Sequence, residues 1–211
     1  MKLVLFVPAF PKFSETFIVS KFLGLLEKGH DVYIVCNQST REDWDHFKQL
    51  QSKPELRERV YVHWRFRPRW LVGLLLPLRI VHTLYSAPKE TLRYFARGLR
   101  RFHPLDLLRR FYGDAAIITA KPDVLHFEFG ALAAERMYLK DLLGCKVITS
   151  FRGYDLNRSG LERGNYYADV WKSADYLHLL GHDLWNRAQM RGCPPEKPHV
   201  FIPPAIDLTF F

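Results

Sequence analysis

The first thirty residues place an apolar run directly before a segment with helical periodicity, and this pairing constrains the fold most strongly. Residues 2–7 are apolar almost throughout, which is typical of a strand buried on both faces of a parallel sheet. Apolar residues then recur at helical spacing over 18–26, and Gly29 stands where a helix would end. We therefore predict that residues 8–16 connect the carboxyl end of a first strand to the amino end of a first helix.

The same alternation continues along the chain. Helical or irregular segments separate further predicted strands, which lie at 31–36, 60–63, 123–127, 146–151, 176–180 and 200–202. After the fourth strand, helices are predicted at 131–143, from about 164 to 173, and at 183–191. Strands separated by helices form parallel sheets with right-handed crossovers. The sequence therefore predicts an α/β fold with a doubly wound, mostly parallel, Rossmann-like sheet.

Three predicted strand ends carry polar residues or glycine. Open α/β sheets bind ligands at the carboxyl ends of their strands, and helix amino termini favour anions. The candidate substrate-binding residues are Phe13, Ser14, Glu15, Thr16, His126, Gly130, Gly153 and Tyr154. The first loop has no glycine-rich fingerprint, so an ordinary dinucleotide site is not predicted there. A plain strand-to-helix connection is the alternative interpretation of this loop.

Three charged residues at these strand ends are the candidate catalytic groups. Glu128 and Asp155 could act as a base or orient sugar hydroxyls, and Arg152 could pair with a phosphate or carboxylate. His126 lies two residues before Glu128, so both share one strand face, although a hydrogen-bonded core histidine is the simpler interpretation. Tyr154 is expected to pack.

The positive charge is concentrated in one segment. Residues 57–110 hold 13 Lys or Arg against three acidic residues, whereas the remainder holds 18 against 19. Within 89–102, one side of a predicted helix carries arginines and the other carries large apolar residues. The candidate membrane-surface residues are Arg93, Arg97, Arg100 and Arg101. A basic amphipathic helix can lie on an anionic membrane surface. The alternatives are a core-packed helix with a solvated basic face and, with no recognition motif to favour it, nucleic-acid binding.

The cysteines and the apolar runs bear on localisation. Cys36, Cys145 and Cys193 are odd in number and lack metal-ligand spacing, so we expect reduced core residues, no metal site and a cytosolic protein. No signal peptide is predicted. The longest apolar run, 70–78, contains Pro77 and falls short of the roughly 20 residues that span a bilayer. We expect a cytoplasmic protein, peripheral on the inner face of the membrane.

Several segments in order resemble those of bacterial glycosyltransferase family 4 enzymes of the exopolysaccharide, capsule and colanic acid type. Residues 8–18 resemble the family's "P…SETFI" opening, and 26–32 its "L…GHxV" turn. Residues 123–130 (DVLHFEFG) are similar to "DvIHaHFG", and 150–155 (SFRGYD) to "SFHGYD". The end of the chain, from Gly192 to Phe210, resembles "GxP…K…V…nGiDxxxF".

The resemblance implies one half of a GT-B enzyme, in which two Rossmann-like domains face each other across a cleft. Residues 1–203 would form the amino-terminal acceptor-side domain, with a basic helical insertion at about 64–120. Residues 204–211 would begin the connection to a carboxyl-terminal donor domain that this chain lacks, so the chain is expected to be inactive alone. The family implies retention of configuration, no metal and no cofactor, a UDP- or GDP-sugar donor in the full-length enzyme, and a saccharide or lipid-linked acceptor.

Two residues depart from the family pattern. The "HGYD" histidine is Arg152 here, and the second histidine of "HaHFG" is Glu128. A guanidinium is permanently charged and cannot replace an imidazole as acid or base, so Arg152 is expected to bind a phosphate or carboxylate. Two other classes stay open. One is a non-catalytic basic module that binds membranes or nucleic acid, and the other is a different doubly wound enzyme such as a methyltransferase.

Overall fold

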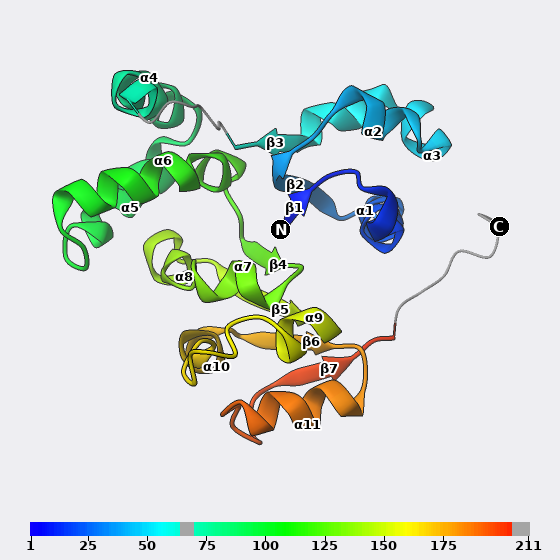
Figure 1. Ribbon diagram of the computed structural model, residues 1–211. Coiled ribbons are helices and arrows are strands. Elements are labelled where there is room, and N and C mark those ends of the chain that lie inside the picture. The colour runs from blue at the N-terminus through cyan, green and yellow to red at the C-terminus, as the bar shows by residue number, and fades with distance from the viewer. Residues whose placement is uncertain (64–69, 204–211) are drawn as a thin grey trace.

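The computed structural model describes residues 1–63 and 70–203, which form an α/β structure around one parallel sheet (Figure 1). The seven strands lie in the order β3-β2-β1-β4-β5-β6-β7, and every neighbouring pair is parallel. The strands are β1 (Lys2–Ala9), β2 (Asp31–Gln38), β3 (Val60–Val62), β4 (Val124–Phe127), β5 (Lys146–Phe151), β6 (Tyr176–Leu179) and β7 (His199–Phe201). The predicted fold class is confirmed.

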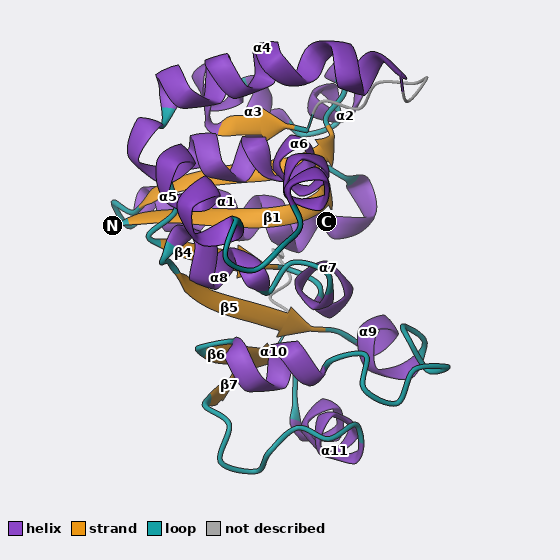
Figure 2. Cartoon of the chain, turned by 90° about the vertical axis from the view of Figure 1, so that its left-hand side faces the viewer, coloured by secondary structure: helices purple, strands orange, loops and turns teal. Residues whose placement is uncertain are grey.

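The helices divide between the two faces of the sheet. The first group is η1 (Phe13–Glu15), α1 (Thr16–Glu27), α2 (Arg41–Asp45), α3 (Lys48–Gln51) and η2 (Pro54–Arg59). The second is α4 (Trp70–Ser86), α5 (Pro88–Gly98), α6 (Pro104–Ala120), α7 (Gly130–Ala134), α8 (Tyr138–Leu143), α9 (Gly153–Asn157), α10 (Ala168–Ser173) and α11 (His182–Met190). Helices α1 to α3 pack on one face and α4 to α11 on the other (Figures 1 and 2).

Strand β1 shows why the first apolar run is continuous. Its side chains alternate between two cores: Val4 and Phe6 belong to the core under α4 to α11, and Leu5 and Val7 to the core under α1 to α3. All four are completely buried. A central strand covered on both faces needs apolar residues at successive positions.

The strand order reverses between β1 and β4. From β1 the chain moves through α1 to β2 and β3, whereas from β4 it moves the opposite way through β5 and β6 to β7. Right-handed crossovers then place α1 on one face and α7 to α11 on the other. A ligand crevice forms at such a switch point, outside the carboxyl ends of the strands.

Two predicted elements differ from the structure. The predicted helix 131–143 is two helices, because the chain turns between α7 and α8. The predicted loop after β5 contains the short helix α9, whose amino terminus is capped by Asp155: this carboxylate accepts from the backbone N–H of Arg152. The sequence predicts a chemical role for Asp155, whereas in the structure its carboxylate is part of a capping box that begins α9.

The predicted helix 89–102 ends earlier, since α5 stops at Gly98. Of the apolar residues on its predicted apolar side, Phe95 and Phe102 pack against the core, whereas Leu92 and Leu99 are 62% and 59% exposed. Tyr94 is also buried, and its hydroxyl donates to the buried Asp114 of α6 at 2.9 Å. Tyr138 of α8 donates to the same carboxylate oxygen at 2.8 Å. One carboxylate thus joins α5, α6 and α8.

Part of the domain prediction is outside the described residues. This applies to the predicted connection at 204–211 and to residues 64–69 of the predicted insertion. In the described part of the chain, no helix is long and apolar enough to cross a membrane.

Candidate functional site

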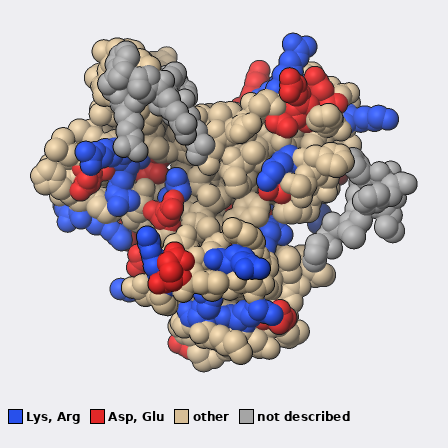
Figure 3. Space-filling model, viewed as in Figure 1, with Lys and Arg blue, Asp and Glu red and all other residues tan. Residues whose placement is uncertain are grey.

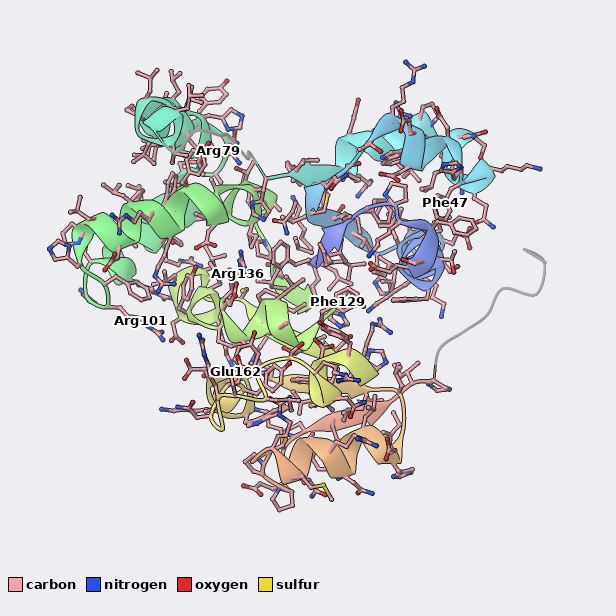
Figure 4. The ribbon with its side chains drawn as sticks, in the orientation of Figure 1. Phe47, Arg79, Arg101, Phe129, Arg136 and Glu162 are labelled. Atoms are coloured by element: carbon pink, nitrogen blue, oxygen red, sulfur yellow. The ribbon has the colours of Figure 1, made fainter. Side chains whose placement is uncertain are left out.

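The candidate site lies at the switch point, where the ends of β4 and β5 meet the first turns of α1. Strand β4 ends between His126 and Glu128, strand β5 ends between Ser150 and Arg152, and α1 contributes Lys21. Figure 4 labels Phe129 at the end of β4, on the side facing α1.

Glu128 is the centre of the cluster. Its side chain has no exposed surface, and one carboxylate oxygen lies 2.5 Å from Lys21 Nζ and the other 3.2 Å from Arg152 Nη2. Burial alone would raise the pKa of Glu128, but the neighbouring positive groups outweigh it and hold this pKa at about 2. Glu128 is therefore a charged anchor for two cations.

Arg152 is held in a fixed orientation. Its guanidinium lies 3.8 Å from the ring centre of Phe17 and 5.5 Å from that of Phe129, and its Nε donates to the carbonyl of Glu128 at 3.3 Å. Burial lowers the pKa of Arg152, while Glu128 raises it. Stacking on aromatic faces and binding a carboxylate use the planar guanidinium in a way that a lysine ammonium could not reproduce.

A row of donors runs from α1 across three strands. Burial lowers the pKa of His126 to about 3, so the ring is neutral and its Nδ1 accepts from Lys21 Nζ at 3.1 Å. Its Nε2 then carries the proton and donates to Ser150 Oγ at 2.8 Å. Ser150 donates to His178 Nδ1 at 2.8 Å, and His178 Nε2 donates to the carbonyl of Ile202 at 3.1 Å. Every donor in this row points in the same direction.

Sheet register explains how these side chains meet. His126 pairs with Leu5 and Ser150 with His178, and paired residues of parallel strands point to the same face. This is the α1 face, whereas α7 to α11 pack on the opposite one. The row therefore lies on the face of the sheet opposite those helices.

Asp155 ties two loops of the site together. Its carboxylate oxygens accept from the backbone N–H of Ala131 at 3.1 Å and of Arg152 at 3.0 Å, at the starts of α7 and α9. Burial raises the pKa of Asp155, while these amides and Arg152 lower it. Both oxygens are engaged in helix capping, so the geometry gives Asp155 an organising position. Its predicted catalytic role stays a prediction, as does that of Glu128.

The first loop borders the cluster and interacts with it through Glu15, whose charge raises the pKa of Arg152. Phe13 and Ser14 are exposed, Thr16 is half-buried, and Glu15 pairs with Lys12 Nζ at 2.7 Å. The binding roles predicted for these residues stay predictions.

Gly130, Gly153 and Tyr154, the other predicted binding residues, differ in how much space surrounds them. Gly130 requires glycine, because a Cβ there would lie 2.4 Å from the ring of Phe151. A Cβ at Gly153 would meet only Asn157, at 3.7 Å. Tyr154 is 74% exposed, so the expectation that it packs was wrong: it lies on the outward side of the short α9.

The four predicted membrane-surface arginines lie at the opposite, amino edge of the sheet. Arg93 and Arg97 donate to the carbonyls of Leu143 and Asp141 at the end of α8, at 2.6 and 2.5 Å. Arg101 pairs with the Asp141 carboxylate at 2.7 Å, and Arg100 is exposed. Arginine donors at a helix carboxyl terminus satisfy its free carbonyls. Three of the four therefore support the fold as well as carrying charge.

Sequence reasoning missed three members of the site. Lys21 follows Ile18 by three residues, so it lies next to the apolar side of α1. A cation at such a position is the one sequence signal that could have indicated its role in the site. Ser150 and His178 occupy strand positions whose alternation places them on one face with His126. Within residues 1–63 and 70–203, no group of three His, Cys, Asp or Glu side chains could hold a metal ion.

Two curated proteins are similar to the chain over its whole length. A protein of Salmonella typhimurium, described provisionally as the colanic acid biosynthesis glycosyltransferase WcaL, is 31% identical over 236 aligned residues. Its counterpart in Escherichia coli, described in the same words, is 27% identical over 227. Each alignment covers 100% of this chain and 52% of the relative, so the chain spans about half the length of the curated relatives it matches. No protein-family model matches the chain.

Proposed function

We propose that this chain is part of a bacterial glycosyltransferase that acts in exopolysaccharide synthesis. The similarity to two proteins described as colanic acid glycosyltransferases supports the reaction class. The observation that carries the proposal is the cluster at the switch point, where buried Glu128 holds Lys21 and Arg152 at the carboxyl ends of β4 and β5. Two fixed cations at a ligand-binding sheet edge suit a substrate that carries phosphate and develops negative charge during transfer.

The exposure of each side chain determines the role that we propose for it. Glu128 has no exposed surface and so acts by holding the two cations. Arg152 and Lys21 keep partly exposed side chains, which can face a diphosphate leaving group or an acidic acceptor. In the retaining, metal-independent transfer that we propose, the donor phosphate accepts the acceptor proton. These residues then need only bind, orient and balance charge.

We also propose that this half holds mainly the acceptor. A carboxyl-terminal domain of the same protein would hold the UDP- or GDP-sugar, and the acceptor would be a saccharide or a lipid-linked saccharide. On this assignment the 211-residue chain alone has no transferase activity and binds nucleotide-sugars weakly at best. The α1 side of the sheet, at the carboxyl ends of β4 and β5, is where a second domain would complete the cleft.

Titration of the chain with two kinds of probe tests the proposal. Oligosaccharides released from colanic acid serve as acceptor probes, and UDP-glucose and GDP-mannose serve as donor probes, followed by calorimetry and by NMR. We expect the oligosaccharides to shift resonances around Arg152, and Arg152→Met to weaken this binding about ten-fold or more. The matched control is Arg158→Gln, which removes an exposed cation at the other end of α9 and should leave binding unchanged.

The two parts of the proposal fail separately. Tight binding of a nucleotide-sugar to this chain would overturn the assignment of the halves but keep the reaction class. Absence of any saccharide-induced shift near Lys21 and Arg152, with the folded state verified by circular dichroism, would overturn the site itself.

A further inference from the structure

In helix α4 the charged residue faces inward and apolar residues face outward, the opposite of an ordinary surface helix. Its only Lys or Arg, Arg79, is 3% exposed, whereas its outward stripe is apolar. That stripe consists of Leu74, Leu78, Val81 and Tyr85, at successive spacings of four, three and four residues, and their exposed fractions lie between 62% and 91%. Surface helices of globular proteins place charged residues outward and apolar residues inward. The arrangement in α4 therefore indicates an outer environment that is not water alone.

Packing fixes which side of α4 faces outward. Thr83 is fully buried, and Leu76 and Ile80 pack against the main core. Figure 4 places Arg79 on the side of α4 that turns toward the rest of the molecule. The apolar stripe is on the opposite side of the helix, so a rotation that buried it would expose this packed side.

A second apolar row continues the surface onto α5. Leu92 and Leu99 are exposed, with the exposed Ala96 between them at helical spacing. The two helices are joined where Thr91 Oγ1 donates to the carbonyl of Thr83 at 3.1 Å. Both lie in the outer layer on the left-hand side of Figure 1 and toward the viewer in Figure 2.

Cations border these apolar rows. The exposed basic residues of α5 and of the turn after it are Lys89, Arg93, Arg97, Arg100 and Arg101. Figure 3 shows Lys and Arg side chains gathered on this left-hand side, below α4. Next to them is an open hollow of about 550 Å³, lined by Arg97, Arg100, Arg101, Lys140 and Lys146 among others. This combination of exposed leucines and neighbouring cations suits a surface that is apolar inside and anionic outside.

We propose that α4 and α5 form a docking surface for an anionic lipid bilayer, with the apolar stripe of α4 inserted at the boundary between headgroups and acyl chains. The amphipathic pattern and the flanking cations are the two features that hold helices in the plane of a membrane surface. The positive charge beside the apolar rows is complementary to an anionic bilayer and would repel a second copy of the chain. A symmetric dimer through this face would bring the exposed cations of α5 and of the turn after it close to the same cations of the second copy.

An environment-sensitive fluorophore on α4 tests the insertion directly. Tyr85→Cys supplies a single reactive thiol, because the native Cys36, Cys145 and Cys193 are all buried. We expect a blue shift of the label with vesicles rich in phosphatidylglycerol, a much smaller one with phosphatidylcholine alone, and a weaker response as salt is added. The same label at Met190→Cys, an exposed position on α11, should not respond.

Matched variants separate the apolar contribution from the charge contribution in vesicle flotation. Leu78→Gln together with Val81→Gln leaves the charge unchanged and should weaken binding about ten-fold or more, whereas Arg100→Gln should weaken it about five-fold. The controls are Leu161→Gln and Arg158→Gln, which change an exposed leucine and an exposed arginine elsewhere on the molecule.

The outcomes decide the proposal in both directions. Binding that needs anionic lipid, shifts the label at position 85 and falls in the α4 variants supports it. Absence of binding to either vesicle, or equal binding of the α4 and control variants, would overturn it. A lipid-independent dimer in sedimentation equilibrium that dissociates in the Leu78→Gln/Val81→Gln variant would assign the surface to a second copy instead.

Discussion

Replacing Glu128 by Gln keeps the shape of the side chain and removes the charge that Lys21 and Arg152 share. The pKa of Glu128 is about 2 against an ordinary value of 4.5. At about 1.4 kcal/mol per pKa unit, this difference corresponds to about 3–4 kcal/mol of folding stability at neutral pH. Removing one member of a buried ion pair costs ~3–5 kcal/mol. Because 27% of the Lys21 side chain is exposed and can be hydrated, we expect the lower end, about 3 kcal/mol.

The pH dependence of this loss has a definite sign. A carboxyl whose pKa is lowered by folding contributes stability above its unfolded pKa, and this contribution is lost as the pH falls toward the folded pKa. The difference between wild type and Glu128→Gln should therefore be complete at neutral pH, begin to shrink below about pH 4.5, and fall to about half or less near pH 3.

Urea denaturation of both proteins at several pH values measures this difference, and thermal unfolding should show a midpoint lower by roughly 6–12 °C. Glu135→Gln is the control, since that carboxylate is 68% exposed and pairs with Arg136 at the surface. Surface pairs contribute about 1 kcal/mol or less. A loss below about 1 kcal/mol for Glu128→Gln, or a loss that is as large near pH 3 as at neutral pH, would refute the reasoning.

Three further predictions concern other parts of the structure. Asp114→Ala removes the acceptor of two buried phenol hydroxyls and should cost about 3–5 kcal/mol in urea denaturation; a cost near that of a surface substitution would contradict this. Gly130→Ala should cost ~1–3 kcal/mol because its Cβ would lie 2.4 Å from a ring, whereas Gly24→Ala, with open space in α1, should be neutral or stabilising in the same assay. His126, with a pKa of about 3, should show no NMR titration between about pH 8 and 5 and should carry its proton on Nε2; a titration midpoint near 6.5 would argue against this.

The strands were predictable because their signal is local. A run such as residues 2–7 carries its own evidence, since a strand buried on both faces must be apolar at every position. For the residues that meet in the site, the neighbouring sequence does not indicate which residue each one contacts. Lys21 and Glu128 are 107 residues apart and meet only because β1 and β4 are neighbours in the sheet. Periodicity predicts which elements form, and it does not give the pairing that brings these two charges together.

The buried side of α5 also depends on a distant partner. The spacing of apolar residues over 89–102 leaves open whether they face the core or a membrane. In the structure Phe95 and Phe102 pack against the core, Leu92 and Leu99 are exposed, and Tyr94 is buried. Tyr94 and Tyr138 share one buried acceptor, the carboxylate of Asp114 on α6. This hydrogen bond between helices favours burial of Tyr94, and the hydrophobic pattern of one helix does not indicate it.

The position of β1 in the middle of the sheet has a consequence for synthesis on the ribosome. β1 pairs with β2 on one side, but on the other side its partner is β4, whose residues come more than a hundred positions later. At ordinary elongation rates that partner emerges on the order of ten seconds after β1. For this interval the most apolar strand of the chain keeps one edge without a native neighbour, and such an edge is a template for intermolecular pairing. The nascent chain thus depends on early cover from α1 and β2, or on a chaperone, until residue 127 has left the exit tunnel.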